Sequence, residues 1–327
     1  MKAILYTEYG SPDVLQLCDI EKPVPKAGEV LIKIHAVSAN PLDWHLMRGE
    51  PFLARLENGF RKPKNPRLGA DIAGTVEAVG SGITQFQSGD AVFGDCFNTG
   101  LGGFSEYVIV PEDALVHKPD NITFEEAAAV PIAAYTALQG LRNKGKIQAG
   151  QKVLINGASG GVGTYAVQIA KALGAEVTGV CSTRNLDLVR SIGADHVIDY
   201  TKQDFTRAGQ QYDLIFDAVG NHTPADFARV LKPGGICCVA GFTSLSILFR
   251  VIVVGGLMSR FGSKEIGLME TAHTDKDDLL LLRDLLATGT IKSVVDRCYP
   301  LEDTAEAIRY LETSRARGKV IIKIANS

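Results

Sequence analysis

Residues 152–175 read KVLINGASGGVGTYAVQIAKALGA, and this stretch decides the fold. KVLIN (152–156) is a short apolar run typical of a buried strand. The apolar spacing over 162–173 predicts a helix that ends at Gly174. Between them lies the glycine-rich loop GASGGVG (157–163). A strand, a glycine-rich loop and a helix in this order predict the first βα unit of a nucleotide-binding domain.

The loop has the features of a phosphate-binding turn. Ala158, Gly160 and Gly163 occupy the three positions of a GxGxxG fingerprint, with alanine in the first. Gly160 lets the backbone approach a pyrophosphate, and Gly163 permits close contact between helix and strand. The helix N-terminus adds free N–H groups and a favourable dipole. We therefore expect the loop to bind cofactor phosphates through Ser159, Gly160, Gly161 and Val162. The alternative, a glycine-rich turn without a ligand, is disfavoured by the surrounding βα pattern.

The βα alternation continues toward the C-terminus. Short apolar runs that read as strands buried on both faces predict a parallel sheet. These runs are EVTGVC (176–181), HVIDY (196–200), YDLIFDAVG (212–220), GICCVAG (235–241) and EIGLMET (265–271). TFEEAAAVPIAAYTALQGL (123–141) opens with a threonine cap and predicts one alanine-rich helix leading into this region.

The regions on either side of this βα alternation have a different sequence pattern. Residues 1–120 contain short alternating runs separated by glycine and proline, which predict a largely antiparallel, barrel-like domain. After two helices, 275–289 and 301–318, the chain ends on KVIIKI (319–324), a strand expected to pair back with the first domain. We therefore predict an α/β protein in which a doubly wound Rossmann domain, 123–272, is inserted into a barrel-like catalytic domain, 1–122 plus 273–327.

Composition limits the classes of function. The 327 residues are 46% hydrophobic and 22% charged, with a formal net charge of −3, which gives no electrostatic case for binding nucleic acid or an anionic membrane. The six cysteines show no CxxC spacing and are expected to be buried free thiols. MKAILYTEYG (1–10) alternates like a strand and lacks a signal-peptide core, so we expect a cytoplasmic protein.

One apolar run falls outside this scheme. LSILFRVIVVGGLM (245–258) is too short to span a bilayer and contains Arg250, so no integral membrane segment is expected. We expect it to be buried or to contact a second subunit. Peripheral contact with a membrane remains the alternative.

The second strand of the nucleotide-binding unit bears on cofactor choice. VTGVCSTRN (177–185) lacks the acid that grips a ribose hydroxyl in NAD sites, and the first acid is Asp187. Ser182 and Arg184 stand there instead, and they would bind a 2′-phosphate that a carboxylate would repel. The expected cofactor is NADP(H). In the alternative interpretation Arg184 is an ordinary surface cation, and nothing discriminates the two cofactors.

Several stretches together resemble the medium-chain dehydrogenase/reductase superfamily, specifically its zinc-independent quinone oxidoreductase (zeta-crystallin-like) branch. They are VLIKIHAVSANPLDW (30–44), GADIAGTVEAVG (69–80), GDAVFG (89–94), GGFSEYVIVPE (102–112), AAVPIAAYTAL (128–138), VLINGASGGVGTYAVQIAKALGA (153–175) and GKVIIKI (318–324). The resemblance spans nearly the whole chain. It implies a GroES-like catalytic domain, an inserted Rossmann domain, a cleft between them and a homodimer through the last Rossmann strand.

The resemblance also implies that no metal takes part. Zinc-dependent members place three ligands at positions that correspond here to Asn40, Ala70 and about Ala129. Asparagine and alanine do not supply the thiolate or imidazole ligands that zinc takes. The four-cysteine lobe for a structural zinc is absent as well, since Cys96 stands alone in its segment.

Hydride transfer to an electron-poor acceptor is the chemistry that remains. We expect an NADPH-dependent oxidoreductase acting on quinones or other α,β-unsaturated carbonyls, with two alternatives: a dedicated enone or alkenal double-bond reductase, and a non-catalytic NADPH-binding or sensing protein. The candidate catalytic residues carried over from the family are Asn40, Asp43, Trp44 and Tyr135. The candidate cofactor residues it adds are Tyr200, Val219, Gly241, Phe242 and Lys319.

Most of these candidates also have an ordinary structural interpretation. Asn40 before Pro41 is a common turn element, Asp43 a common helix cap, and Trp44 a common packing residue. Asp71 is expected to tether local backbone rather than to act as a base. Lys319 is as readily a surface lysine as a cofactor ligand.

Overall fold

The computed structural model describes residues 1–52 and 55–324, and the chain divides into two compact units. Unit 1 comprises Met1–Ile132, Thr274–Gly289 and Ser293–Ser327, and unit 2 comprises Ala133–His273 and Thr290–Lys292. Inserting one domain into the other agrees with the sequence-based prediction.

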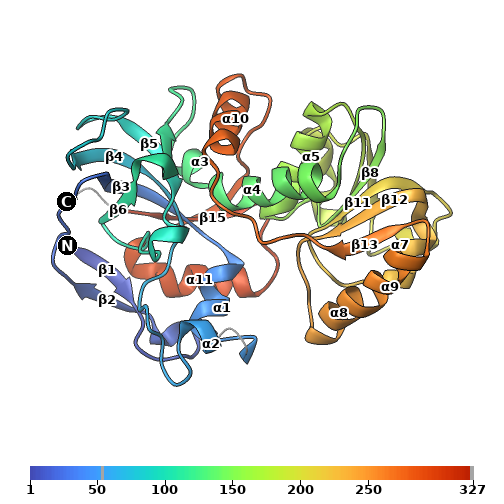
Figure 1. Ribbon diagram of the computed structural model, residues 1–327, viewed down its shortest axis with the longest axis horizontal. Coiled ribbons are helices and arrows are strands. Elements are labelled where there is room, and N and C mark those ends of the chain that lie inside the picture. The colour runs from blue at the N-terminus through green and yellow to red at the C-terminus, as the bar shows by residue number, and fades with distance from the viewer. Residues whose placement is uncertain (53–54, 325–327) are drawn as a thin grey trace. The chain divides into compact units, whose positions relative to one another are not determined.

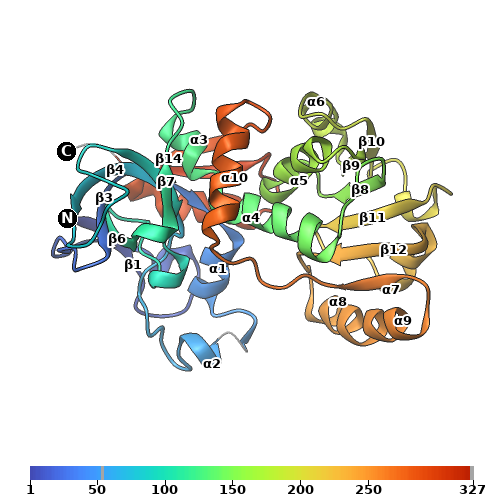
Figure 2. The same cartoon turned by 45° about the horizontal axis from the view of Figure 1, so that its top comes forward.

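Unit 2 is built on a parallel sheet with helices on both faces (Figures 1 and 2). Its six strands run in the order β10-β9-β8-β11-β12-β13, the doubly wound order expected of a dinucleotide-binding fold. The strands are β8 Lys152–Asn156, β9 Glu176–Cys181, β10 His196–Asp199, β11 Tyr212–Asp217, β12 Leu231–Val239 and β13 Glu265–Leu268. The helices are α4 Pro131–Gln139, α5 Gly161–Ala172, α6 Leu186–Ser191, α7 Pro224–Val230, α8 Leu245–Arg250 and α9 Gly256–Phe261. Two π-helical segments, Gly140–Lys144 and Val251–Gly255, follow α4 and α8.

Burial explains why the strands of unit 2 read as continuous apolar runs. Leu154 of β8 and Ile215 of β11 are fully buried, and Phe227 of α7 and Val251 pack into the same cluster. A parallel strand covered on both faces has no polar side, so its sequence does not alternate.

Unit 1 is a largely antiparallel, barrel-like sheet organised around β3. The N-terminal half of β3 pairs with β6 and its C-terminal half with β15, while β4 pairs along its other edge. The strands are β1 Lys2–Leu5, β2 Gln16–Asp19, β3 Glu29–Ala39, β4 Asp71–Val79, β5 Ala91–Asp95, β6 Tyr107–Pro111, β7 Leu115–His117, β14 Val295–Pro300 and β15 Lys319–Lys323. The helices are α1 Pro41–Arg48, α2 Arg55–Asn58, α3 Phe124–Ala128, α10 Lys276–Ala287 and α11 Thr304–Glu312.

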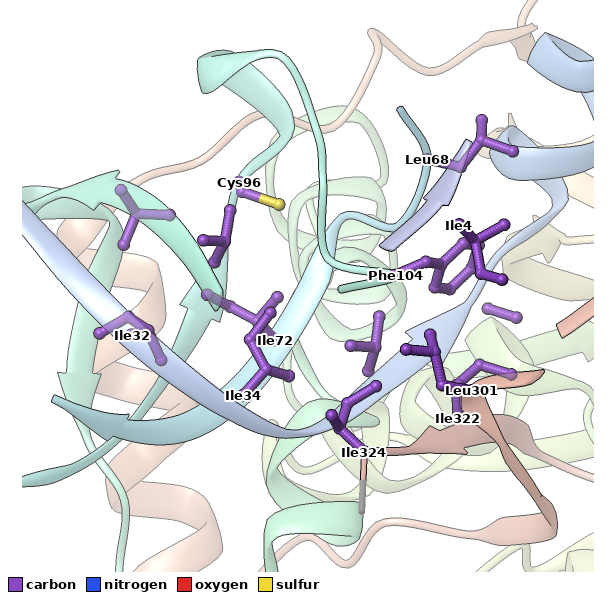
Figure 3. Packing of buried hydrophobic residues seen from close by; sticks show 14 of the residues in the cluster. Ile4, Ile32, Ile34, Leu68, Ile72, Cys96, Phe104, Leu301, Ile322 and Ile324 are labelled. Atoms are coloured by element: carbon purple, nitrogen blue, oxygen red, sulfur yellow. The ribbon is translucent and has the colours of Figure 1, made fainter. Parts of the chain in front are cut away.

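The final strand does pair back with the first domain, as the sequence predicted. Val320 of β15 lies opposite Ala39 of β3 in an antiparallel ladder. The core beneath this ladder draws on both ends of the chain, because Ile4 and Ile34 share one cluster with Leu301 and Ile322 (Figure 3).

The first boundary between the units lies after Ile132, whereas the sequence-based prediction placed it after Ile122. The reason is that α3 packs against β3 and β4 of unit 1. The backbone N–H of Ile132 also donates to the Asp71 carboxylate, at 2.8 Å, so the chain up to this residue is held by unit 1.

Three local predictions were wrong or incomplete. The single helix predicted over 123–141 is two helices, because Pro131 lacks an N–H and starts a new helix, α4. The segment 245–258 is helical and only partly buried in this chain, because much of its apolar surface is exposed, and the predicted contact with a second subunit stays a prediction. The short strands β2, β7 and β14 were not predicted.

The cysteines are all free thiols, in agreement with the prediction, but not all are buried. Cys96, Cys181, Cys237 and Cys238 are buried, whereas Cys298 is exposed. Among the described residues, none of the helices combines the length and apolar character that crossing a bilayer requires.

Candidate active site

The predicted cofactor residues of unit 2 all follow the carboxyl ends of its parallel strands. The loop 157–163 follows β8, Ser182 and Arg184 follow β9, and Tyr200 follows β10. Val219 follows β11, and Gly241 with Phe242 follow β12. Because the strands are parallel, these segments lie along one edge of the sheet, where ligands bind in doubly wound folds.

The N-terminus of α5 is open to an anion. Gly160 is the N-cap and supplies no side-chain hydrogen bond to the first turn. The first N–H groups of a helix have no partner within the helix, so those of Gly161 and Val162 are directed at whatever lies before it. A β-carbon added to Gly160 would meet only the Gly157 carbonyl oxygen, at 3.4 Å, so the space in front of this residue is open.

Gly163 has a different role from Gly160. A β-carbon added to Gly163 would lie 2.0 Å from the Gly157 carbonyl oxygen, far inside contact distance. The loop therefore folds back onto the helix at Gly163 and leaves its open side at Gly160. The close contact at Gly163 is of the kind predicted for this glycine, while the approach of a pyrophosphate to Gly160 stays a prediction.

A buried hydrogen bond supports the loop from the segment that follows β9. The Asn185 side-chain amide donates to the Ser159 hydroxyl oxygen, at 2.8 Å. The Asn185 side-chain carbonyl oxygen is buried and, among the described residues, has no hydrogen-bond partner. The orphaned oxygen is an acceptor and fits a ligand group that donates, such as a ribose hydroxyl, while the open helix N-terminus fits the phosphates of a dinucleotide.

The turn after β11 is held by Asp217. This carboxylate accepts hydrogen bonds from the Asn156 side chain at 2.8 Å and from the amides of Val219 and Gly220 at 3.1 Å. Burial raises its pKa, against the lowering effect of these donors. Asp217 thus caps the turn that carries Val219. Gly241 and Phe242 follow the next strand, and the Phe242 ring is partly exposed.

An acidic residue lies beside the predicted 2′-phosphate segment. Asp199 at the end of β10 pairs in register with Cys181 at the end of β9. Its carboxylate accepts hydrogen bonds from the hydroxyls of Thr183, at 2.6 Å, and Thr201, at 2.7 Å. These hydrogen bonds, Thr183 first, lower the pKa of Asp199 and keep it ionised. The hydroxyl protons of Thr183 and Thr201 are therefore directed at Asp199, so a 2′-phosphate would rely on Ser182, Arg184 and Tyr200.

Removing the Asp199 charge is expected to strengthen NADPH binding. The substitution Asp199→Asn keeps a hydrogen-bond acceptor for Thr183 but removes a negative charge near the predicted phosphate. The dissociation constant for NADPH should fall roughly fivefold, while that for NADH changes little. Fluorescence titration of both nucleotides measures the effect. Asp187→Asn, at an acid that pairs with Arg190 instead, is the matched control. Equal effects of Asp199→Asn on NADPH and NADH would contradict the assignment.

Unit 1 contains a buried polar cluster that joins three distant parts of the chain. The Lys319 ammonium donates to the Asn40 side-chain oxygen at 2.6 Å and lies 3.4 Å from the Asp71 carboxylate. The Asn40 side-chain amide donates to Asp71, at 2.9 Å, and to the Ser38 carbonyl, at 3.3 Å. All three side chains are less than 5% exposed. Burial raises the pKa of Asp71 and lowers that of Lys319, and in each case the opposite charge of the partner counteracts it.

This cluster corrects two of the predicted roles. Lys319 was expected at the cofactor or on the surface, but it is buried in unit 1 and bonded to Asn40. Asn40 was a candidate catalytic residue whose side-chain amide could donate to an acceptor, but both N–H groups of this amide already donate within the protein. We therefore assign both residues to positioning β3, β4 and β15. The Asp71 carboxylate tethers backbone, as predicted, through the amide of Ile132.

Asp43 also proves structural. Its carboxylate accepts hydrogen bonds from the backbone N–H of Asn40, at 2.7 Å, and of Gly69, at 2.8 Å. The first bond closes the N-terminus of α1, and the second ties that helix to the segment before β4. The predicted catalytic role is therefore replaced by its alternative, a helix cap.

The buried Asp43 predicts an unusual dependence of stability on pH. Burial raises the pKa of Asp43 from 3.8 to about 7, although the two amides favour the charged form. Between these values the folded protein holds a proton that the unfolded chain has released. A rise in pH from about 4 to about 7 therefore lowers the free energy of unfolding, by at most about 4 kcal/mol for this group.

Asp43→Asn should flatten this dependence. Urea denaturation of both proteins at several pH values between about 4 and 8 measures the difference. Asp95 contributes a decline of the same sign in both proteins, because burial raises its pKa to about 6. For each protein the free energy of unfolding is plotted against pH, and the effect of Asp43 is the difference between the slopes of the unchanged protein and the variant. Identical slopes would show that Asp43 ionises normally.

The cluster does not fit a zinc ion. In the described ranges 1–52 and 55–324, no group of three or more His, Cys, Asp and Glu side chains is placed to share a metal. At the position of the family's first ligand, Asn40 accepts a hydrogen bond from an ammonium group, which would repel a second cation. Ala70 and Ala129 are fully buried and carry no donor atom.

The two aromatic candidates lie in different units. Trp44 of α1 is partly buried against the core of unit 1, and its ring stacks on that of His45 with centroids 3.6 Å apart. Tyr135 is buried in α4 of unit 2. Their contacts with a substrate stay predictions.

Several residues of both clusters were not predicted as site residues. Asn185 and Asp199 each follow or end a strand of unit 2, and that position was the available signal. Asn156, at the end of β8, was also not predicted, although its position at the end of a strand gave the same signal. Nothing in the local pattern indicates that Lys319 meets Asn40, because 279 residues separate them.

Two family models match the chain. Residues 26–120 match the "Alcohol dehydrogenase GroES-like domain", and residues 192–322 match "Zinc-binding dehydrogenase".

Similar proteins match over nearly the full chain. The chain is 35% identical to "2-methylene-furan-3-one reductase" of Solanum lycopersicum and 34% identical to "NADPH-dependent alkenal/one oxidoreductase, chloroplastic" of Arabidopsis thaliana. Both matches cover 98% of this chain and 79% of the relative. The solved structure of the quinone oxidoreductase from Coxiella burnetii superposes with a TM-score of 0.87, at 31% identity and 99% coverage of both chains.

Proposed function

Because the chain belongs to the medium-chain dehydrogenase/reductase superfamily, in its quinone oxidoreductase branch, we propose that it is an NADPH-dependent reductase of quinones or other α,β-unsaturated carbonyls. The observation that carries the proposal is the N-terminus of α5, which has no side-chain cap, together with the free space in front of its N-cap residue, Gly160. The relatives named as an alkenal/one oxidoreductase and as a furanone reductase support the acceptor class.

The residues along the carboxyl edge of the sheet in unit 2 would hold the cofactor. The pyrophosphate would lie at the amides of Gly161 and Val162, with Ser159 beside it. The 2′-phosphate would lie against Ser182, Arg184 and Tyr200. Val219, Gly241 and Phe242 would line the nicotinamide side. When bound, NADPH would supply the hydride, while the protein would orient the cofactor.

We propose that the polar residues of unit 1 position the acceptor-binding elements and do not take part in the reaction themselves. Asn40 and Asp43 fix the start of α1, and this helix carries Trp44, which would offer a flat apolar surface to a planar acceptor. The acceptor oxygen gains negative charge during reduction. We propose that water supplies the proton, because both N–H groups of Asn40 already donate within the protein.

An acceptor panel tests the proposal. NADPH oxidation with 1,2-naphthoquinone or 9,10-phenanthrenequinone should exceed background, and simple enones and alkenals belong in the same panel. Turnover of enones with poor turnover of quinones would favour a dedicated double-bond reductase. Tight NADPH binding without oxidation of any acceptor would favour the sensing protein and contradict the reductase.

The assembly and the compartment are proposed as well. A homodimer through β13 is supported by the position of this strand at the edge of its sheet, where a strand of a second copy could be added beside it. Light scattering coupled to size-exclusion chromatography measures the mass. The sequence favours the cytoplasm, whereas some relatives are named chloroplastic, so fractionation of the source cells decides this point.

A further inference from the structure

One helical surface of unit 2 has no role in the proposed reaction. Residues 245–261 form an uninterrupted helical segment: α8, the π-helix Val251–Gly255, and α9. One side of it packs on the core of unit 2 through Ile247, Val251 and Met258. In Figures 1 and 2, α8 and α9 lie together on the face of the sheet opposite α5.

The other side of this segment is apolar too, although it faces solvent. Phe249 is 66% exposed and Phe261 is 79% exposed. The exposed large apolar residues, which we call the apolar ridge, are Leu245, Phe249, Ile252, Val253, Val254, Leu257 and Phe261. Five of them recur at every fourth position, so they follow one another along the helix. A helix that is apolar all round is normally covered, and a patch of this kind marks a site of interaction.

The charged side chains of the segment itself have one sign. Arg250 and Arg260 are exposed on the same segment. The sequence contains no aspartate or glutamate between Asp226 and Glu265, although the whole chain has a net charge of −3. The ridge thus combines exposed aromatic and aliphatic side chains with arginines that can extend past them. Exposed apolar side chains on a segment whose only charged residues are arginines match the surface of an anionic bilayer, which is apolar inside and negatively charged at its headgroups.

A second copy of the chain fits this surface poorly. A two-fold contact through the ridge would bring the arginines of two copies together, with no acid in the segment to pair with them. Anionic lipid headgroups would instead pair with each arginine while the acyl region takes up the phenyl rings. The charge pattern therefore favours a lipid surface over self-association.

We propose that residues 245–261 are a peripheral membrane-docking helix, which lies in the headgroup region of an anionic bilayer. At 1.5 Å per residue the segment is about 25 Å long, enough to follow the membrane plane over several lipids. Phe249 and Phe261 enter the acyl boundary, and Arg250 and Arg260 bind the headgroup phosphates. This docking is independent of the proposed reaction.

Flotation with lipid vesicles tests the docking. The purified full chain should float with vesicles of phosphatidylcholine containing about a third phosphatidylglycerol, and much less with pure phosphatidylcholine. The Phe249→Ser/Phe261→Ser double variant should lose at least about tenfold in the bound fraction. Arg250→Gln/Arg260→Gln should bind both vesicle types equally weakly. Val24→Ser, at an apolar residue of unit 1 that is 79% exposed, should bind like the unchanged protein.

Three results would overturn the proposal. The first is no flotation of the folded protein with anionic vesicles. The second is equal flotation of the Phe249→Ser/Phe261→Ser variant, which would place the contact elsewhere. The third is conversion of a dimer to monomers by this variant without any vesicle binding by the parent, which would assign the ridge to a second copy. Circular dichroism and NADPH binding by each variant verify that unit 2 has folded.

Discussion

Replacing Lys319 with methionine is expected to lower the free energy of unfolding by about 3–5 kcal/mol. The ammonium group is buried beside Asp71 and donates to Asn40, so its loss leaves a buried carboxylate without its counter-charge. Urea denaturation at neutral pH measures the change. Lys323→Met is the matched control on the same strand, because this lysine is exposed and its pair with Glu125 lies at the surface. Lys323→Met should lower the free energy of unfolding by less than about 1 kcal/mol.

A double variant distinguishes the charge effect from a general packing defect. Adding Asp71→Asn to Lys319→Met removes both charges and should recover part of the lost stability. The corrected role of Lys319 also makes a claim about binding: where the single variant is folded, its affinity for NADPH should be unchanged. A loss of stability no larger than that of Lys323→Met, or a selective loss of NADPH binding, would contradict the structural role.

The second large effect is expected at the phosphate loop. Gly160→Ala should weaken NADPH binding by about tenfold to a hundredfold while leaving the melting temperature nearly unchanged. The added methyl group meets no protein atom closer than 3.4 Å, yet it enters the open space in front of α5. Isothermal titration measures the affinity, and calorimetry measures the melting temperature.

Gly163→Ala should behave in the opposite way. Its methyl group would lie 2.0 Å from the Gly157 carbonyl oxygen, so the loop and helix must separate and the protein loses stability. If both variants lost stability equally, or if Gly160→Ala bound NADPH normally, the pyrophosphate would not lie at Gly160.

Local patterns predicted the scaffold well. The strands β3, β8 and β11 are each covered by a run of residues whose periodicity reports burial on one or both faces. The loop 157–163 was equally clear, because the special roles of Gly160 and Gly163 are local properties of one turn. Pro131 is a local signal too, and the predicted single helix over 123–141 ignored it.

The residues of unit 1 were harder to interpret because their contacts are not local. No local pattern indicates that Asn40, Asp71 and Lys319 meet, because their contact depends on the pairing of β3 with both β4 and β15. Solvent exposure was also hidden. An apolar run such as 245–258 looks the same whether its outer side is covered or not, so the sequence could not separate burial from an exposed ridge.

The pairing of β15 with β3 affects the order in which the chain can fold during synthesis. Residues 133–273 form nearly all of unit 2 as one continuous stretch, so this unit can fold while later residues are still being translated. In unit 1, by contrast, β3 is synthesised early and lacks its partner β15 until that strand leaves the ribosome. Asp71 has no counter-charge until then, because Lys319 lies on β15. The nascent N-terminal half is therefore the portion that needs protection from aggregation, and a ribosome stalled before Lys319 releases a chain whose second unit is complete and whose first is not.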